Sequence, residues 1–195
     1  MILLITNRSD LTCDYIVREL TERRLKFARL NTDEFPKNAR GLFALTSDGT
    51  TVRWIRLMDR DKIIDFDEVS SVLYRRPIPP QPSEEVAEEG VRKFCIDEGY
   101  DFLRGLWYSL DCLWVSHPEA IRKAEHKVYQ LKVASDLGFL IPQTLITNDP
   151  REVLEFFKKC TNGVVVKPLY VGFVEGTGDR SGRIVYTSVV KTDDL

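Results

Sequence analysis

The sequence begins Met1-Ile2-Leu3-Leu4-Ile5, a short apolar run that the polar stretch Asn7-Arg8-Ser9-Asp10 ends. Such a run predicts a buried strand. Apolar residues then recur with helical spacing, at Cys13, Ile16, Val17 and Leu20. We expect a second strand over residues 26–30. Because a helix separates the two strands, they are expected to pair in parallel, which predicts an α/β fold.

An antiparallel hairpin is expected after this unit. Asp48-Gly49 lies between two apolar stretches, residues 42–46 and 51–57, and this arrangement is a strong hairpin signal. A further strand, Ser71–Arg76, ends at Pro77, which cannot continue a sheet ladder. The first part of the chain is therefore expected to hold a mixed, largely parallel sheet with helices and an inserted β-hairpin.

The second part of the chain is expected to be a smaller α+β segment. Before it, a long helix is expected from Ser83, bent or split by Gly90, Gly99 and Gly105. Pro118 fits the first turn of the next helix. We therefore place the domain boundary between residues 117 and 118. Residues 118–137 follow one helical stripe that ends at Gly138. A strand over 143–147, a helix capped by Asp149 and a buried strand over 164–167 are expected to follow.

The composition is that of an ordinary globular protein. Hydrophobic residues make up 43% of the chain, charged residues 30%, and the net charge is −2. This balance gives no electrostatic reason to expect nucleic acid or a membrane as partner. The four cysteines lie far apart and match neither a zinc pattern nor a disulfide framework. We therefore expect a soluble, cytoplasmic protein with reduced thiols.

Two lysines are candidates for binding an anion. Lys167 ends an apolar strand, where a rigidly placed ammonium could bind phosphate, and Lys127 lies in the helical run before it. A solvated surface position is the alternative for each lysine taken alone. The glycine-rich stretch 171–182 follows Lys167 and includes Gly176 and Gly178, whose backbone could cover phosphates. Its alternative is a long hairpin loop, and it has no Walker A lysine.

Arg75 and Arg76 are candidates for binding an acidic substrate. They end a strand at the edge of the sheet where α/β proteins place their ligands, and a guanidinium binds carboxylate through two hydrogen bonds. Since successive strand residues point to opposite faces, only one of the two is expected to face a ligand. The alternative is a surface ion pair for each. His117 and His126 have no neighbours that suggest a metal site, and the sequence has no nucleophile elbow.

Several segments together resemble the ATP-grasp ribosomal-peptide maturases of the microviridin type and, more distantly, the RimK-type glutamate ligases. The segments that carry this resemblance are residues 29–36, Val72-Leu-Tyr-Arg-Arg-Pro77, residues 127–132, Gly138, residues 142–150 and Val165-Val-Lys-Pro168. The resemblance implies a pre-ATP-grasp domain over residues 1–117 and the first, ATP-binding subdomain of an ATP-grasp fold over residues 118–195. It also implies that Lys127, Lys167, Gly176 and Gly178 bind ATP.

The resemblance further implies the reaction. Such enzymes use ATP and Mg²⁺ to phosphorylate an acidic side chain of a ribosomal precursor peptide, and a hydroxyl or amine then attacks the acyl phosphate to form an ester or amide crosslink. A homodimer is possible. The adenine-binding segment and the magnesium ligands of the family lie downstream of residue 195, so this chain is expected to contain no catalytic residue and no metal ligand and to be inactive alone. The alternatives are a non-catalytic peptide-binding module, or a ligase acting on a small amino acid or a protein tail.

Overall fold

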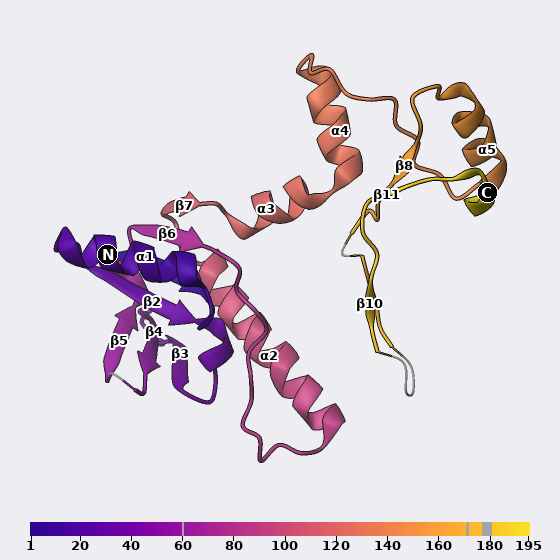
Figure 1. Ribbon diagram of the computed structural model, residues 1–195. Coiled ribbons are helices and arrows are strands. Elements are labelled where there is room, and N and C mark those ends of the chain that lie inside the picture. Colours follow the sequence, from indigo (N-terminus) through magenta and orange to yellow (C-terminus); the bar gives the residue numbers. More distant parts are fainter. Residues whose placement is uncertain (60, 171, 177–180) are drawn as a thin grey trace. The chain divides into compact units, whose positions relative to one another are not determined.

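The computed structural model describes residues 1–59, 61–170, 172–176 and 181–195. The chain divides into two compact units, Met1–Pro118 and Glu119–Leu195 (Figure 1). The elements of the first unit are β1 (Ile2–Thr6), α1 (Leu11–Glu22), β2 (Phe27–Asn31), β3 (Ala39–Leu45), β4 (Thr51–Leu57), β5 (Lys62–Asp65), β6 (Ser71–Tyr74), α2 (Glu89–Tyr108) and β7 (Leu113–Val115).

A parallel sheet in the order β2-β1-β6-β7 forms the centre of the first unit. Ile2 is in register with Phe27 on one side and with Ser71 on the other, so β1 is an interior strand. The expected parallel β-α-β unit is confirmed. The strand order reverses between β1 and β6, because β2 lies on one side of β1 while β6 and β7 lie on the other.

The expected hairpin is also confirmed. β3 and β4 pair antiparallel across a turn at Gly49, whose φ of 86° favours glycine, and β5 extends this second sheet. Gly41 in β3 lies so close to α2 that a Cβ atom there would stand 2.3 Å from the ring of Phe102. The hairpin therefore packs closely on α2.

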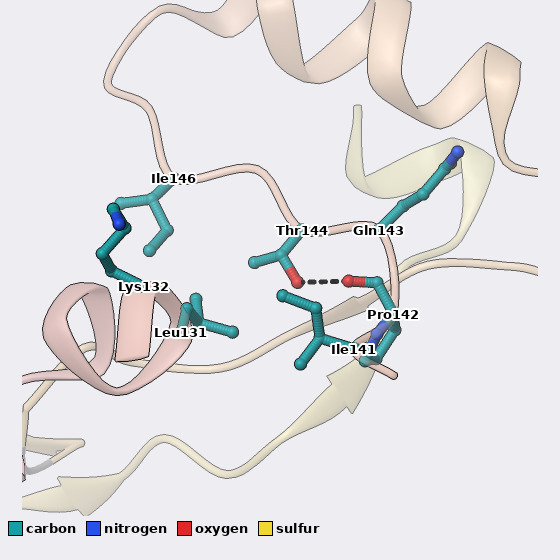
Figure 2. Close-up of a pocket in the computed structure, with 7 residues that line it drawn as sticks. All are labelled: Leu131, Lys132, Ile141, Pro142, Gln143, Thr144 and Ile146. Carbon is teal, nitrogen blue, oxygen red and sulfur yellow. Dashed lines mark hydrogen bonds between the residues drawn. The ribbon is translucent and has the colours of Figure 1, made fainter. Parts of the chain in front are cut away.

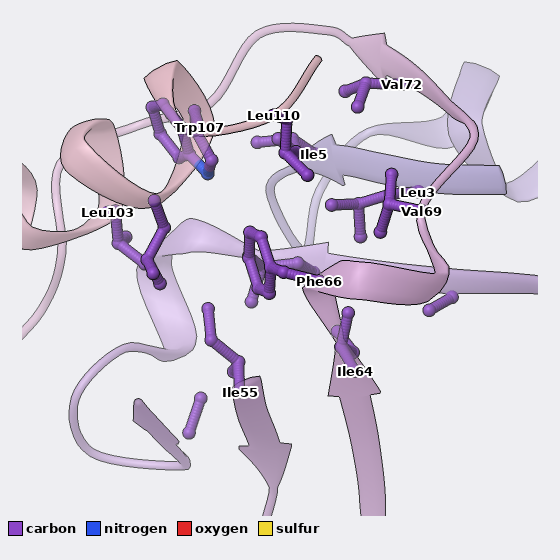
Figure 3. Packing of buried hydrophobic residues seen from close by; sticks show 14 of the residues in the cluster. Leu3, Ile5, Ile55, Ile64, Phe66, Val69, Val72, Leu103, Trp107 and Leu110 are labelled. Carbon is purple, nitrogen blue, oxygen red and sulfur yellow. The ribbon is translucent and has the colours of Figure 1, made fainter. Parts of the chain in front are cut away.

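The hydrophobic core fills the space between the two sheets and α2. Figure 3 shows Trp107 of α2 near Ile5 of β1, with Phe66 between the parallel sheet and Ile55 of β4. Trp107 and Phe66 are at most 1% exposed, and the rings of Tyr74 and Trp107 meet edge to face at a centroid distance of 5.3 Å. The first unit thus has one continuous core.

α2 differs from the helix expected from the sequence. It begins at Glu89 rather than near Ser83, because the guanidinium of Arg92 binds the carbonyl oxygen of Ser83 and residues 84 and 85 form a turn. The helix runs unbroken through its three glycines, and a Cβ atom added at Gly99 would lie 3.4 Å from side-chain atoms of Phe35 and Pro80.

The second unit contains α4 (Lys127–Asp136), α5 (Pro150–Lys159) and two short strand pairs, and α3 (Pro118–Glu125) leads into it. The pairs are β8 (Val165–Val166) with β11 (Ser188–Val189), and β9 (Phe173–Val174) with β10 (Arg183–Ile184). The expectation of one helix over 118–137 was wrong, because His126 has extended backbone angles and separates α3 from α4.

Two of the expected helix ends in this unit are confirmed. Gly138 has a φ of 76°, and the amides of Gly138 and Phe139 bind the carbonyl oxygens of Ser135 and Ala134, which is a Schellman motif. The carboxylate of Asp149 accepts a hydrogen bond from the amide of Arg151 at the start of α5.

Two other expectations for this unit were wrong. Residues 143–147 form no strand, since within the described residues no neighbouring strand pairs with them. β8 is exposed rather than buried: Val165 is 61% exposed. Among the described residues of Glu119–Leu195 none is fully buried, so this unit lacks a core like that of the first.

Candidate functional site

A cavity of about 990 Å³ lies at the start of α4. Its lining includes four Lys or Arg side chains and one acidic residue, Glu125. The lining residues are Arg122, Lys123, Glu125, His126, Lys127, Val128, Tyr129, Lys132, Leu169 and Tyr170. A cavity with this surplus of cationic groups favours an anionic ligand.

Lys127 connects the two segments that carry the candidate lysines. It is the first residue of α4, and its Nζ donates a hydrogen bond of 2.6 Å to the carbonyl oxygen of Leu169. Leu169 follows Lys167 by two residues, so the end of the β8 segment lies beside the start of α4. The structure thus brings the two lysine-bearing segments together, although Lys167 itself does not line the cavity.

Lys167 is exposed and directly follows β8. Its ammonium group has no hydrogen bond or ion pair within the described part of the chain. A partner-free ammonium on a strand end can bind an anion without first breaking another contact. The exposed position that the sequence left open for Lys167 is the one observed.

The glycine-rich stretch 171–182 contains β9 and is followed by β10. Gly176 follows β9 and is exposed, while Gly178 lies outside the described residues. Two other glycines have a steric reason to be there: a Cβ at Gly172 would stand 2.3 Å from the carbonyl oxygen of Val185, and one at Gly182 would stand 2.5 Å from the ring of Phe173. These contacts show a closely packed hairpin on both sides of the segment.

A second cavity, of about 510 Å³, lies beside α4 (Figure 2). Leu131 and Lys132 line it from the helix, facing residues 141–146, and Thr144 donates a hydrogen bond to the carbonyl oxygen of Pro142. Its lining is largely aliphatic. Among these lining residues only Lys132 is cationic, so this cavity offers an anion less positive charge than the cavity at the helix start.

Arg75 has an internal partner. Its Nε lies 3.0 Å from Oδ2 of Asp10, its Nη2 donates to the hydroxyl of Thr12, and its amide binds the carbonyl oxygen of Ile5. Burial raises the pKa of Asp10, but hydrogen bonds from Thr6, the Cys13 amide and Arg75 outweigh it and hold that pKa below its usual value. The ion pair left open by the sequence is therefore observed for Arg75.

Arg76 is exposed and has a left-handed backbone, with φ of 46°. Its carbonyl oxygen accepts a hydrogen bond of 2.7 Å from the side-chain amide of Asn7. No local sequence pattern singled out Asn7 or the basic residues Arg122 and Lys123. Asp10 was recognisable only as part of a polar turn before a helix.

Within the described residues, no group of three His, Cys, Asp or Glu side chains is arranged to hold a metal ion. Nor does any helix in that part of the chain have the length and apolarity needed to cross a membrane.

The first unit has the architecture of a pre-ATP-grasp domain, a parallel sheet with an inserted hairpin. The unit that follows it contains the cationic cavity. Residues 1–122 match the model of the MvdD pre-ATP-grasp domain, and the chain belongs to this family. No curated protein sequence matches the chain.

Solved structures of ATP-grasp ligases share this fold over almost the whole chain. Macrocyclase MdnC of Microcystis aeruginosa, bound to its precursor peptide MdnA, is 28% identical with a TM-score of 0.85, over 99% of this chain and 62% of MdnC. Macrocyclase MdnB of the same organism is 30% identical with a TM-score of 0.78, over 100% of this chain and 62% of MdnB.

A third structure contains a nucleotide. A RiPP-associated ATP-grasp ligase of Chryseobacterium gregarium, in complex with ADP and with a leader and core peptide, is 27% identical with a TM-score of 0.86, over 98% of this chain and 56% of that one. The chain thus spans about three fifths of these ligases.

Proposed function

We propose that the chain is part of an ATP-dependent ligase that activates acidic side chains of a ribosomal precursor peptide as acyl phosphates. The observation that carries this proposal is the cationic cavity at the start of α4, where Lys127 is bonded to the segment that follows Lys167. The family membership supports it, as does the similarity to a ligase whose structure holds ADP and peptide.

The charges of the cavity suit the phosphates of ATP. Lys127 would exchange its bond to the Leu169 carbonyl for a phosphate oxygen, and Lys167 would bring a second ammonium without losing a partner. The N-terminus of α4 adds open amides, because His126 provides no side-chain cap. Backbone amides near Gly176 and Gly178 would cover the phosphates.

In the proposed reaction a carboxylate oxygen of the peptide attacks the γ-phosphorus, and the bond to the bridging oxygen breaks to release ADP. A hydroxyl or amine of the peptide then attacks the acyl carbon and expels phosphate, so each crosslink loses one water from the peptide. Fixed cations lower the energy of the charge that spreads over the phosphoryl oxygens. Mg²⁺, when bound, would supply further positive charge that stabilises the phosphoryl group during transfer.

The ATP site can be tested with Lys127→Met and Lys167→Met. Each variant should bind ATP roughly ten- to hundredfold more weakly in calorimetric titrations, because a charge-assisted hydrogen bond contributes about 1.5–3 kcal/mol. The matched control is Lys158→Met, since Lys158 lies on α5, outside the cavity, and pairs with Glu155 at 3.0 Å. ATP affinity should stay at the parent value in that control.

Unchanged ATP affinity in both Lys127→Met and Lys167→Met would remove this site from the proposal. The reaction itself is tested by incubating the complete ligase with ATP, Mg²⁺ and an acidic peptide, which should give ADP release and mass losses of water, whereas the 195-residue chain alone should give neither. Peptide binding that needs no nucleotide, in a protein without ATP affinity, would favour the non-catalytic binding module instead. Turnover of a free amino acid would favour a small-molecule ligase.

A further inference from the structure

The carboxyl ends of β1, β2 and β6 meet at one edge of the parallel sheet. The strand order reverses between β1 and β6, and open α/β sheets bind ligands outside the carboxyl ends of their strands at such a reversal. Asn7 follows β1 directly, and Arg75 and Arg76 follow β6. These residues therefore lie where a ligand of the first unit is expected.

Most arginines at this edge already have a carboxylate partner. Arg8 lies 3.7 Å from Glu34, Arg29 pairs with Asp14, and Arg75 pairs with Asp10. Arg76 is the exception: across the described part of the chain its guanidinium has no ion pair or hydrogen bond. Among the arginines of this edge, Arg76 is therefore the one without a carboxylate partner within the described residues.

The backbone that carries Arg76 is held on both sides. Asn7 is 9% exposed; its side-chain oxygen accepts the amide of Ser9 at 2.8 Å, and its nitrogen donates to the carbonyl oxygen of Arg76. On the other side, Pro77 fixes φ, and the amide of Ile78 binds the hydroxyl of Thr32 at 3.0 Å.

The positive φ of Arg76 is costly for a residue with a Cβ atom, and glycine would fit there without this cost. Strained backbone of this kind is often found at ligand sites, where the surrounding structure holds it in place. The guanidinium offers five donors in a planar fork that matches a carboxylate, and a fixed backbone reduces the entropy lost on binding.

We propose that Arg76 binds a carboxylate of an acidic side chain in the peptide substrate, outside the carboxyl ends of β1 and β6. Arg75 is excluded from this role by its bonds to Asp10 and Thr12 and stabilises the turn after β1 instead. The proposal rests on the proposed function for the identity of the ligand, an acidic peptide, but not for the geometry of the site.

The test uses a synthetic peptide of alternating Glu and Thr and its counterpart with Gln in place of Glu. The parent protein should bind the Glu peptide more tightly. Arg76→Gly should weaken that binding roughly tenfold or more and remove the preference for Glu, because it deletes a charge-assisted contact. Arg76→Lys should retain part of the preference, since one ammonium replaces a bidentate fork.

Arg24→Gly is the matched control. Arg24 also has a positive φ, of 54°, but it lies in the turn before β2, at the amino edge of the same sheet. Both glycine variants should melt at or above the parent temperature, because both relieve the same backbone strain. Only Arg76→Gly should lose affinity for the Glu peptide.

Nuclear magnetic resonance gives a second readout, the Nε–H signal of Arg76, which should shift on addition of the Glu peptide and not of the Gln peptide. Equal affinity of parent and Arg76→Gly for the Glu peptide would overturn the proposal. So would equal affinity of the parent for the two peptides. ATP titrations separate this result from the proposed function, because Arg76→Gly should leave ATP affinity unchanged.

Discussion

Asp10 holds together the turn between β1 and α1. Its carboxylate accepts hydrogen bonds from the Thr6 hydroxyl at 2.9 Å and from the amides of Thr12 and Cys13 at 3.1 and 3.3 Å, and it pairs with Arg75. The Asp10 side chain is only 4% exposed. One carboxylate therefore caps α1 and ties it to the end of β6.

Asp10→Ala should lower the free energy of unfolding by about 2–4 kcal/mol, because it removes a helix cap and leaves Arg75 without its anion. Asp10→Asn should lower the free energy of unfolding by less, since Asn can still cap a helix. Urea denaturation measures both. Asp14→Asn is the control: its carboxylate is half exposed and Arg29 keeps its hydrogen bonds to Asn31 and Asn7, so this change should cost no more than about 1 kcal/mol. Equal costs at Asp10 and Asp14 would contradict this account.

The stabilisation by Asp10 should depend on pH. Its pKa is lowered in the folded protein, so this contribution is present above the unfolded pKa of about 3.9 and is lost as pH falls through the lower folded pKa. The stability difference between parent and Asp10→Asn should therefore shrink below about pH 4. A difference that stays constant from pH 7 to pH 2 would show that the charge of Asp10 contributes nothing.

The sequence predicted that one of the two arginines after β6 would face a ligand, but it could not say which. The partners of Arg75 and Arg76 are Asp10 and Asn7, which lie more than sixty residues earlier and approach only when β1 pairs with β6. The roles of Lys127, Lys167, Gly176 and Gly178 in binding ATP stay predictions. The bond from Lys127 to Leu169 could not have been foreseen from local patterns.

At the scale of elements, two glycines should respond in opposite ways to the same substitution. Gly41→Ala should lower the free energy of unfolding by about 1–3 kcal/mol, because the new Cβ would collide with the ring of Phe102. Gly105→Ala in α2 should raise it by up to about 1 kcal/mol, because no atom lies within 4 Å of the new Cβ and alanine favours helix. Thermal unfolding measures both, and two changes of the same sign would contradict the packing of β3 on α2.

Local patterns predicted the elements well where they dominate the energy. Alternation around Asp48-Gly49 predicted the hairpin, and Asp149-Pro150 predicted the start of α5. Local patterns failed where contacts with other segments decide the backbone conformation. Arg92 holds residues 82 and 83 outside α2. The apolar stripe over residues 118–137 does not reveal the extended backbone at His126. Residues 143–147 have strand-like composition but find no partner strand within the described residues.

At the scale of the whole molecule, buried apolar side chains are concentrated in the first unit. Its core cluster reaches from Leu3 to Leu110, whereas the second unit leaves large side chains such as Phe139 and Tyr170 at 67% and 79% exposure. Fully burying a large apolar side chain contributes about 1.5–3 kcal/mol to the free energy of unfolding. The domain division between residues 117 and 118, the homodimer and the cytoplasmic location stay predictions.

We expect residues 1–118 to unfold cooperatively on their own, and the amides of Glu119–Leu195 to exchange hydrogen much faster than those of β1 and α2. Exchange protection follows the free energy of local opening, which is small where few side chains are buried. Hydrogen exchange measured by mass spectrometry on the 195-residue chain tests this directly. Protection in α5 equal to that in α2 would show a second core and contradict the expectation.

Adding ATP to the same exchange experiment connects this stability difference with the proposed site. A ligand stabilises the state that it binds by about 2.7 kcal/mol at a hundredfold excess over its Kd. Exchange should therefore slow around the start of α4 and around Leu169, which Lys127 already joins, while β1 and α2 should not change. The Lys127→Met variant should lose this protection, whereas Lys158→Met should retain it. If ATP slowed exchange in the first unit instead, the nucleotide would bind at the edge of the parallel sheet and not in the cavity at α4.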